Sequence, residues 1–158
     1  NEIWWLVAPQ NRLKKNDISK SFSTRLNFAR RLTGNHKKIK VLDLEYANRL
    51  FSSYKSIKFL KSKCRNTKFV WLMGSDNLLN FDKWLNAKQI SKTFPVAVVE
   101  RPSYSYKEIN CLGANVLGKR LRKIKLSNFN YNISAWTFIR DKLNNISSTK
   151  IRGLDTKH

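Results

Sequence analysis

The feature that most limits the fold of this chain is the alternation of short apolar runs with segments of helical periodicity. The apolar runs lie at residues 3–8, 40–44, 69–73, 95–100 and 135–139. In segments such as 22–33 and 53–63, apolar residues recur at intervals of three and four, the spacing of a helix with one buried face. Apolar strands that alternate with helices are typical of a parallel sheet covered on both faces. We therefore predict one α/β domain over residues 1–158, with a doubly wound parallel sheet.

Local signals place the ends of some of these elements. Ser21 can cap the first helix through its hydroxyl, and Gly34 suits the C-terminal end of that helix. After the third apolar run, either Asp76 or Asn77 is expected to cap the next helix. Residues 103–131 are predicted to form one short helix and otherwise irregular chain.

The charge of the chain allows two interpretations. Its 158 residues include 32 Lys and Arg against 10 Asp and Glu, which gives a formal net charge of +22. Clustered basic side chains neutralise phosphates and release counterions, so a nucleic-acid-binding module is one interpretation. The other is a compositional bias of the source genome, because basic residues are spread along the whole chain, which is also rich in Asn, Ile and Ser. We favour the bias and expect no specific nucleic-acid partner.

The composition argues against several other classes of protein. With 41% hydrophobic and 12% aromatic residues, the chain can bury a core, unlike a disordered polymer. No apolar run approaches the roughly 18 residues of a membrane helix, and no secretion signal is visible. Cys64 and Cys111 match no C-x-x-C spacing, which argues against a disulfide scaffold or a zinc site. We expect a soluble cytoplasmic protein without a membrane partner.

Two groups of polar residues are candidates for ligand binding. Parallel sheets bind ligands beyond the C-terminal ends of their strands, where Gly74 would let a ligand approach the backbone. The Asp76 carboxylate could accept hydrogen bonds from ribose hydroxyls or a pyridine amide, or it could only cap a helix. Ser147 and Thr149 at a helix start, with Arg152 on the next turn, could bind phosphate. Each group by itself also fits an ordinary helix start.

Taken together and in order, these segments resemble the bacterial nicotinate-nucleotide adenylyltransferases of the nucleotidylyltransferase superfamily. The matching stretches are Trp4-Trp5-Leu6-Val7-x-Pro9-Gln10-Asn11-x-Leu13-Lys14, the helix with Arg25, Phe69 to Leu78 with Phe81 and Trp84, Arg101-Pro102-x-Tyr104, and Ile146-Ser147-Ser148-Thr149-x-Ile151-Arg152. The likeness weakens only over residues 103–132. It implies a Rossmann-like fold and a reaction of ATP with nicotinate mononucleotide, with Mg²⁺, that gives the deamido dinucleotide and pyrophosphate.

The resemblance also implies roles for individual residues. The set that would bind ATP and phosphate comprises Ser147, Thr149, Arg152 and Lys14. The set that would bind the nicotinate nucleotide comprises Ser53, Gly74, Asp76, Trp84 and Arg101. Trp84, which read alone is more often a core residue, would stack on the nicotinate ring. The Ser53 hydroxyl would bind the pyridine substrate, although Lys55 reverses the charge of a neighbouring family position.

The largest departure from the family is an absent motif. Family members open with a strand and a G-x-F-x-P-x-H-x-G-H loop whose histidines bind ATP phosphates, whereas the histidines here are His36 and His158. The chain also opens inside an apolar run, so we expect its first strand and catalytic loop to be missing, and no catalytic residue is assigned. In a doubly wound sheet the first strand is central. We therefore expect a gap between the strand at residue 3 and the strand at residue 69.

Three alternatives stay open at this point. Within the superfamily, phosphopantetheine and nicotinamide-mononucleotide adenylyltransferases are the nearest, and the spacing of Trp84 and the Arg101-Pro102-x-Tyr104 string favour the nicotinate enzyme. A basic nucleic-acid-binding module would show steeply salt-dependent binding without pyrophosphate release. The chain could also be a non-functional gene remnant. We expect it to fold poorly and to transfer no adenylyl group by itself, and restoration of an upstream segment to restore activity.

Overall fold

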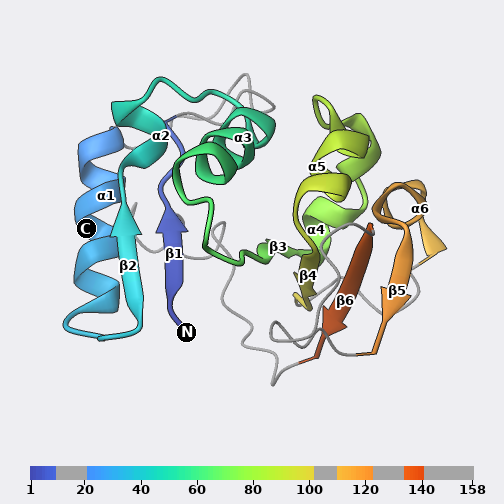
Figure 1. The fold of residues 1–158 in the computed structure, drawn as a ribbon. Helices are drawn as coiled ribbons and strands as arrows, with labels where there is room; N and C mark the ends of the chain where they lie inside the picture. The colour runs from blue at the N-terminus through green and yellow to red at the C-terminus, as the bar shows by residue number, and fades with distance from the viewer. Residues whose placement is uncertain (10–20, 102–109, 123–133, 141–158) are drawn as a thin grey trace. The chain divides into compact units, whose positions relative to one another are not determined.

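The computed structural model describes residues 1–9, 21–101, 110–122 and 134–140, which form helices and parallel strands (Figure 1). The chain divides into two units, Asn1–Lys63 and Cys64–His158, and each is described by itself. Every strand pairing among the described residues is parallel. This confirms the predicted α/β class. No helix in the described ranges is long and apolar enough to span a bilayer.

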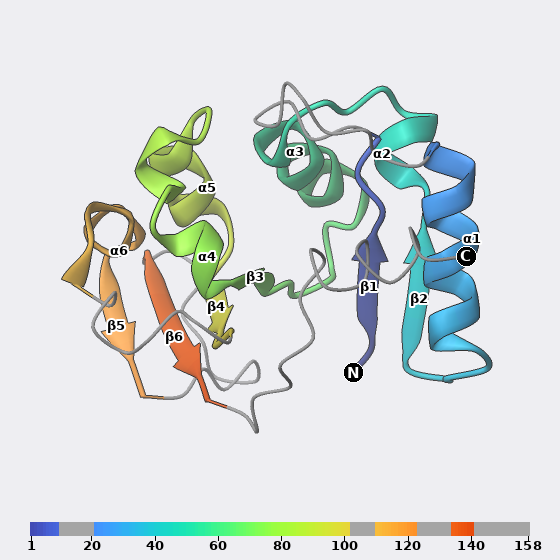
Figure 2. The same cartoon turned by 180° about the vertical axis from the view of Figure 1, so that it is seen from behind.

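The first unit contains a two-stranded parallel sheet and three helices. Its elements, in chain order, are β1 (Ile3–Leu6), α1 (Phe22–Thr33), β2 (Ile39–Leu42), α2 (Leu44–Ala47) and α3 (Ser53–Lys63). In the register of the sheet, Ile3 pairs with Ile39 and Leu6 with Leu42. The helix α1 connects the two strands and lies alongside β2, as the views from both sides show (Figure 2). A small core forms between them from Val7, Leu26 and Ala29.

The helix α1 begins and ends where the sequence predicts. The Ser21 hydroxyl accepts a hydrogen bond from the Thr24 amide at 3.2 Å. At the other end, Gly34 has a φ of 50°, a left-handed conformation that glycine adopts without strain. The guanidinium of Arg25 donates to the carbonyl oxygens of Ala8 at 2.6 Å and Pro9 at 2.5 Å. It thereby fixes the helix to the chain just after β1.

The second unit contains a four-stranded sheet with the strand order β3-β4-β6-β5. Its elements, in chain order, are β3 (Trp71–Gly74), α4 (Ser75–Leu78), η1 (Phe81–Lys83), α5 (Ala87–Thr93), β4 (Val96–Val99), α6 (Leu112–Leu117), β5 (Lys119–Leu121) and β6 (Ala135–Ile139). The inner strands β4 and β6 are the most deeply buried. This burial explains the uninterrupted apolar sequence of β4 and the mainly apolar sequence of β6, in which only Thr137 is polar. The largest side chains with almost no exposed surface include Phe81, Leu78, Ile90 and Trp136.

The close packing of α6 depends on a residue without a side chain. Gly113 is buried in this helix, and a β-carbon placed there would overlap the backbone carbonyl oxygen of Leu78 and lie 3.0 Å from the β-carbon of Phe81. The neighbouring Cys111 thiol lies 3.6 Å from the same Leu78 carbonyl oxygen. The end of α4 and the start of α6 are thus in contact through backbone as well as side chains.

The strands β1 and β3 are edge strands of their sheets. The sequence predicts a gap between these two strands. Among the described strands, β1 pairs only with β2, and β3 pairs only with β4. No described strand joins β1 to β3. Each sheet belongs to its own unit, and the expected gap between the two strands stays a prediction.

Three details of the predicted elements are wrong. Gly74, rather than Asp76 or Asn77, is the N-cap of α4, and no side chain caps that helix. The second strand stops at Leu42, and the short helix α2 begins at Leu44, where the sequence suggests continued strand. The strand β5 was not predicted, because its Lys-Arg-Leu sequence lacks the apolar character of the other strands.

Candidate functional site

The end of β3 carries a cluster of polar groups that comes from two neighbouring strands. Gly74 is paired in register with Val99 of β4, so the residues that follow both strands meet at one edge of the sheet. The Arg101 guanidinium lies 3.1 Å from the Asp76 carboxylate, from Nη1 to Oδ2. The backbone amide of Arg101 also donates to the Ser75 hydroxyl oxygen at 3.0 Å. The structure thus brings together three predicted site residues.

Gly74 leaves room for this cluster. A β-carbon at position 74 would overlap Oδ1 of Asp76 and lie 2.5 Å from Nε of Arg101. The backbone φ of Gly74 is −77°, which any residue can adopt. Space rather than backbone conformation is therefore the reason for a glycine at this position.

The two oxygens of the Asp76 carboxylate have different surroundings. Oδ2 faces Arg101, whereas Oδ1 is buried and has no hydrogen-bond partner among the described residues. A buried oxygen without a donor lowers stability, so Oδ1 favours a hydroxyl or amide that approaches it. Arg101 is 56% exposed in its side chain and Asp76 is 30% exposed. A rotation of the arginine would let a ligand reach the carboxylate.

Trp84 lies at the end of the short helix η1. Its ring centroid is 5.3 Å from that of Phe81, and the two ring planes are inclined by 48°. Phe81 is completely buried, whereas Trp84 keeps part of its surface exposed. The indole therefore rests on the core on one side and leaves surface available for a stacking partner. This position is compatible with the predicted role.

Ser53 belongs to the first unit, where it is the first residue of α3. The preceding Ser52 caps this helix, because its hydroxyl accepts a hydrogen bond from the Lys55 amide at 3.3 Å. Ser53 therefore stands at a helix N-terminus, where free N–H groups attract anions. The remaining predicted residues lie outside the described ranges and are Lys14, Ser147, Thr149 and Arg152.

Three residues of structural importance were given no role from the sequence. Ser75 is buried between the predicted Gly74 and Asp76. Glu45 is only 8% exposed, and its Oε1 accepts a hydrogen bond of 2.6 Å from the hydroxyl of fully buried Ser56. A serine next to a predicted site glycine was a usable signal for Ser75. No pattern marks Glu45, because charged residues are ordinarily exposed.

The burial of Glu45 makes the stability of the protein depend on pH. Burial raises the pKa of its carboxyl above the ordinary value of 4.5, and the Ser56 hydrogen bond opposes part of this effect. The folded state therefore keeps a proton that the unfolded state has released, so the free energy of unfolding should fall as the pH rises from 4.5 to the raised pKa. Glu45→Gln is expected to remove this contribution.

Urea unfolding of both proteins at a series of pH values measures the effect. The difference between their unfolding free energies isolates Glu45 from all other titrating groups. If the two curves ran parallel across this range, Glu45 would not titrate differently in the folded and unfolded states.

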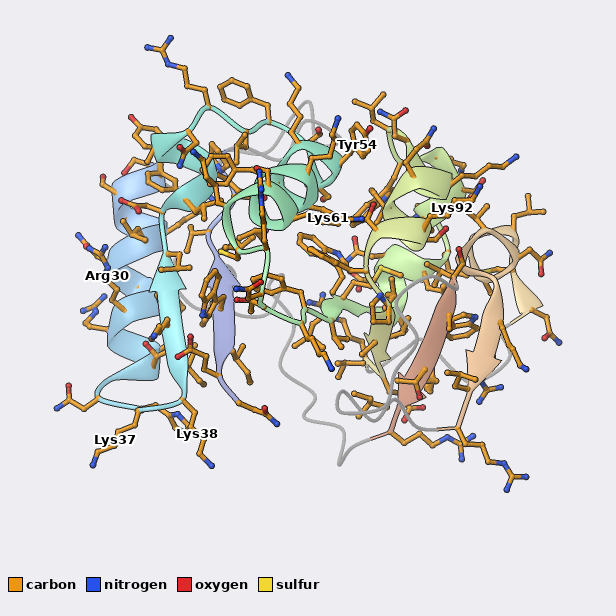
Figure 3. The ribbon with its side chains drawn as sticks, viewed as in Figure 1. Arg30, Lys37, Lys38, Tyr54, Lys61 and Lys92 are labelled. Atoms are coloured by element: carbon orange, nitrogen blue, oxygen red, sulfur yellow. The ribbon has the colours of Figure 1, made fainter. Side chains whose placement is uncertain are left out.

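Basic side chains are distributed over the surfaces of both units. Figure 3 labels Arg30 on α1, Lys37 and Lys38 in the turn before β2, and Lys92 on α5, and these side chains extend away from the ribbon. Some basic groups have specific partners, such as Lys40, which lies 2.7 Å from Glu2. Within the first unit, the labelled basic residues lie on more than one element.

The described residues do not form a metal site. No group of three His, Cys, Asp or Glu side chains in these ranges is close enough together to hold a metal ion. Magnesium usually binds through substrate phosphates, waters and one or two carboxylates rather than in a protein cage. The donor set seen here does not amount to a protein-held magnesium site.

The fold and the site together define a class of protein. Parallel sheets with crossover helices are the features of a Rossmann-like α/β protein, and the polar cluster lies at the carboxyl end of β3, the edge at which such proteins usually bind ligands. The model of the cytidylyltransferase-like family matches residues 1–154 of this chain. The chain belongs to the cytidylyltransferase-like family.

Comparison with individual proteins narrows this assignment. A "probable nicotinate-nucleotide adenylyltransferase" of Rhizobium meliloti (strain 1021) is 30% identical over 154 residues, which are 96% of this chain and 81% of the relative. A Bradyrhizobium protein (strain ORS 278) of the same name is 30% identical over 157 residues, covering 98% of this chain and 81% of that protein. The resemblance stated from the sequence is therefore confirmed.

A solved structure shows the same fold. The Plasmodium falciparum nicotinic acid mononucleotide adenylyltransferase complexed with NaAD superimposes with a TM-score of 0.71 at 20% identity. The comparison covers 99% of this chain and 70% of the other. At this identity the likeness establishes the fold alone, and it confirms the Rossmann-like expectation.

Proposed function

We propose that this protein is a nicotinate-nucleotide adenylyltransferase that transfers the adenylyl group of ATP to nicotinate mononucleotide. The products are deamido-NAD and pyrophosphate, in a step of NAD biosynthesis. The observation that carries this proposal is the match of almost the whole chain, 96% of its length, to a relative of that name. The cluster of Gly74, Asp76 and Arg101 at the end of β3 supports it independently.

The reaction asks little covalent chemistry of the protein. The phosphate of nicotinate mononucleotide attacks the α-phosphorus of ATP in line, a new P–O bond forms, and the bond to the β-phosphate breaks. Pyrophosphate leaves with the bonding electrons. The rate of such a transfer depends on positioning the two substrates and on neutralising their charge. We assign no residue of this chain to the transfer itself.

We propose roles for the described site residues on the basis of their geometry. The unpaired oxygen of Asp76 suits a ribose hydroxyl, which would supply the donor that this oxygen lacks. The partly exposed indole of Trp84 suits the nicotinate ring. Ser53, at the start of α3, offers a hydroxyl beside free helix N–H groups, a favourable place for the negatively charged substrate. Arg101 offers a guanidinium beside Asp76.

The remaining assignments are proposed from the sequence and the family. Ser147, Thr149 and Arg152 would bind the phosphates of ATP, and Lys14 would bind substrate phosphate. Magnesium would enter bound to ATP, because this ion usually binds through substrate phosphates and waters with one or two carboxylates. These proposals leave the protein with small-molecule substrates and no specific nucleic-acid partner.

A substrate panel tests the proposed function on the protein expressed from its complete gene. We expect pyrophosphate release from ATP with nicotinate mononucleotide, and much less with nicotinamide mononucleotide or phosphopantetheine. Asp76→Asn is expected to lower kcat/KM by roughly 10- to 100-fold, the effect of losing one hydrogen bond to a charged group.

Asp82→Asn is the matched control, because Asp82 lies in η1 outside the cluster, and we expect kcat/KM within about twofold of the natural protein. A protein that is inactive with nicotinate mononucleotide but active with another member of the panel would overturn the substrate assignment. An equal loss in both aspartate variants would remove Asp76 from the site.

A further inference from the structure

Glu45 is a buried charged residue for which the proposed reaction has no direct use. It lies in α2 and is 8% exposed, and its partner Ser56 is fully buried. Burial of a carboxylate lowers stability unless its oxygens receive hydrogen bonds. An apolar residue of similar size would fold at least as well at this position. The burial of Glu45 therefore calls for an explanation other than stability.

The contacts of Glu45 connect it to the start of α3. Its backbone carbonyl accepts a hydrogen bond from the Leu50 amide at 2.8 Å. Its side-chain Oε1 accepts one from the Ser56 hydroxyl at 2.6 Å. One residue thus holds both ends of the segment 50–56. Ser53, the first residue of α3, lies inside that segment.

The first turn of α3 is held by further hydrogen bonds, all of which Ser52 accepts. The Ser52 carbonyl accepts from the Ser56 amide at 3.1 Å and from the Ser56 hydroxyl at 3.2 Å. The Ser52 hydroxyl accepts from the Lys55 amide at 3.3 Å. Ser53 and Ser56 are three residues apart, so they lie on neighbouring positions of one helix face. The bond to Glu45 therefore anchors the face of α3 that carries Ser53.

We propose that Glu45 is a positioning residue, which acts through Ser56 to fix the first turn of α3 and the Ser53 hydroxyl for the nicotinate nucleotide. This inference rests on the proposed function, in which Ser53 binds the pyridine substrate. A small displacement of a binding group weakens only the ligand that it contacts. Loss of the Glu45 contact should therefore weaken binding of nicotinate mononucleotide and leave binding of ATP unchanged.

Three variants of the protein from the complete gene test this inference in steady-state kinetics. Glu45→Leu fills the same space without an acceptor and should raise KM for nicotinate mononucleotide on the order of tenfold, the effect of about one hydrogen bond. Ser56→Ala should have the same effect. Glu45→Gln keeps an acceptor and should stay within about threefold of the natural protein, in line with a largely retained hydrogen bond. In all three, KM for ATP and kcat should change less than about twofold.

Stability measurements separate positioning from a merely structural role. Glu45→Leu should unfold at the same or a higher urea concentration than the natural protein at neutral pH, because a buried charge has been removed. A variant that is no less stable but binds nicotinate mononucleotide more weakly supports positioning. Ser91→Ala is the control, because Ser91 is also buried and its hydroxyl donates to the Lys88 carbonyl at 2.9 Å in α5. It should change stability without changing either KM.

Hydrogen exchange provides a readout that does not depend on activity. In Ser56→Ala and Glu45→Leu, the amides of Lys55 and Ser56 (or the residue that replaces it) should exchange faster than in the natural protein, while those in the last turn of α3 should not. Unchanged protection of these amides, or equal increases in KM for both substrates, would overturn the inference. If the natural protein showed no activity with nicotinate mononucleotide but the exchange pattern changed as expected, the proposed function alone would fail.

Discussion

Gly74→Ala is expected to lower kcat/KM by about 100-fold while leaving the stability of the protein nearly unchanged. The added β-carbon would occupy the space of Asp76 Oδ1 and Arg101 Nε. Both are atoms of side chains that can turn away, so the fold can yield without strain. The Asp76–Arg101 pair would then be dispersed, with the loss of hydrogen bonds to charged groups worth about 1.5–3 kcal/mol each. Steady-state kinetics and urea unfolding measure the two effects separately.

Gly34→Ala is the matched control for this variant. Gly34 has a φ of +50° and no atom within 4 Å of an added β-carbon. Alanine there should lower stability by about 1 kcal/mol through backbone strain and should not change kcat/KM. The two glycine variants therefore separate the effect of steric overlap with neighbouring side chains from the effect of backbone strain. A Gly74→Ala protein with full activity would show that the cluster at the end of β3 does not bind substrate.

Gly113→Ala is expected to destabilise the protein by about 3 kcal/mol or more, the upper range for an overpacked core. Here the neighbour of the added β-carbon is the backbone carbonyl oxygen of Leu78, which cannot turn away as a side chain can. The helix α6 would have to move as a whole, with loss of contact to η1. Urea or thermal unfolding measures the change.

Leu112→Ala, in the same helix, is the control for the Gly113 variant. Leu112 is 69% exposed, and its truncation should change the unfolding free energy by less than about 0.5 kcal/mol. A loss in the Gly113 variant no larger than that in the Leu112 variant would mean that the close contact of α6 with the Leu78 carbonyl does not limit stability, because alanine itself favours a helix.

The sequence was sufficient for the parts of the fold in which local chemistry and pattern agree. The Ser21 cap, the Gly34 end and the apolar spacing between them predicted α1 to the residue. The strand β5 was not predicted, because its pairing with β6 depends on tertiary position. No local sequence pattern indicates such a pairing. Asp76 lies in the polar cluster at the end of β3, but its expected capping role was wrong because the carboxylate faces Arg101 instead.

The site was predictable only as far as it follows strand ends and family motifs. Gly74 and Asp76 follow an obvious strand, and Arg101 was named through the resemblance, whereas their contact depends on the register of β3 and β4. Glu45 could not be found, because its importance lies in burial and in one hydrogen bond to Ser56. A pattern of residue types indicates where polar groups stand, but it does not show which of them are withdrawn from water.

The contact of Arg25 with the chain after β1 restricts how this sequence can change during evolution. Lysine outnumbers arginine in the chain, as expected where mutation favours A and T and exchanges arginine codons for lysine codons. Arg25 reaches the carbonyl oxygens of Ala8 and Pro9 with two different nitrogens, and the single ammonium group of lysine lacks this planar fork. We expect position 25 to resist the drift toward lysine, so an arginine retained there in lysine-rich relatives would report selection on structure.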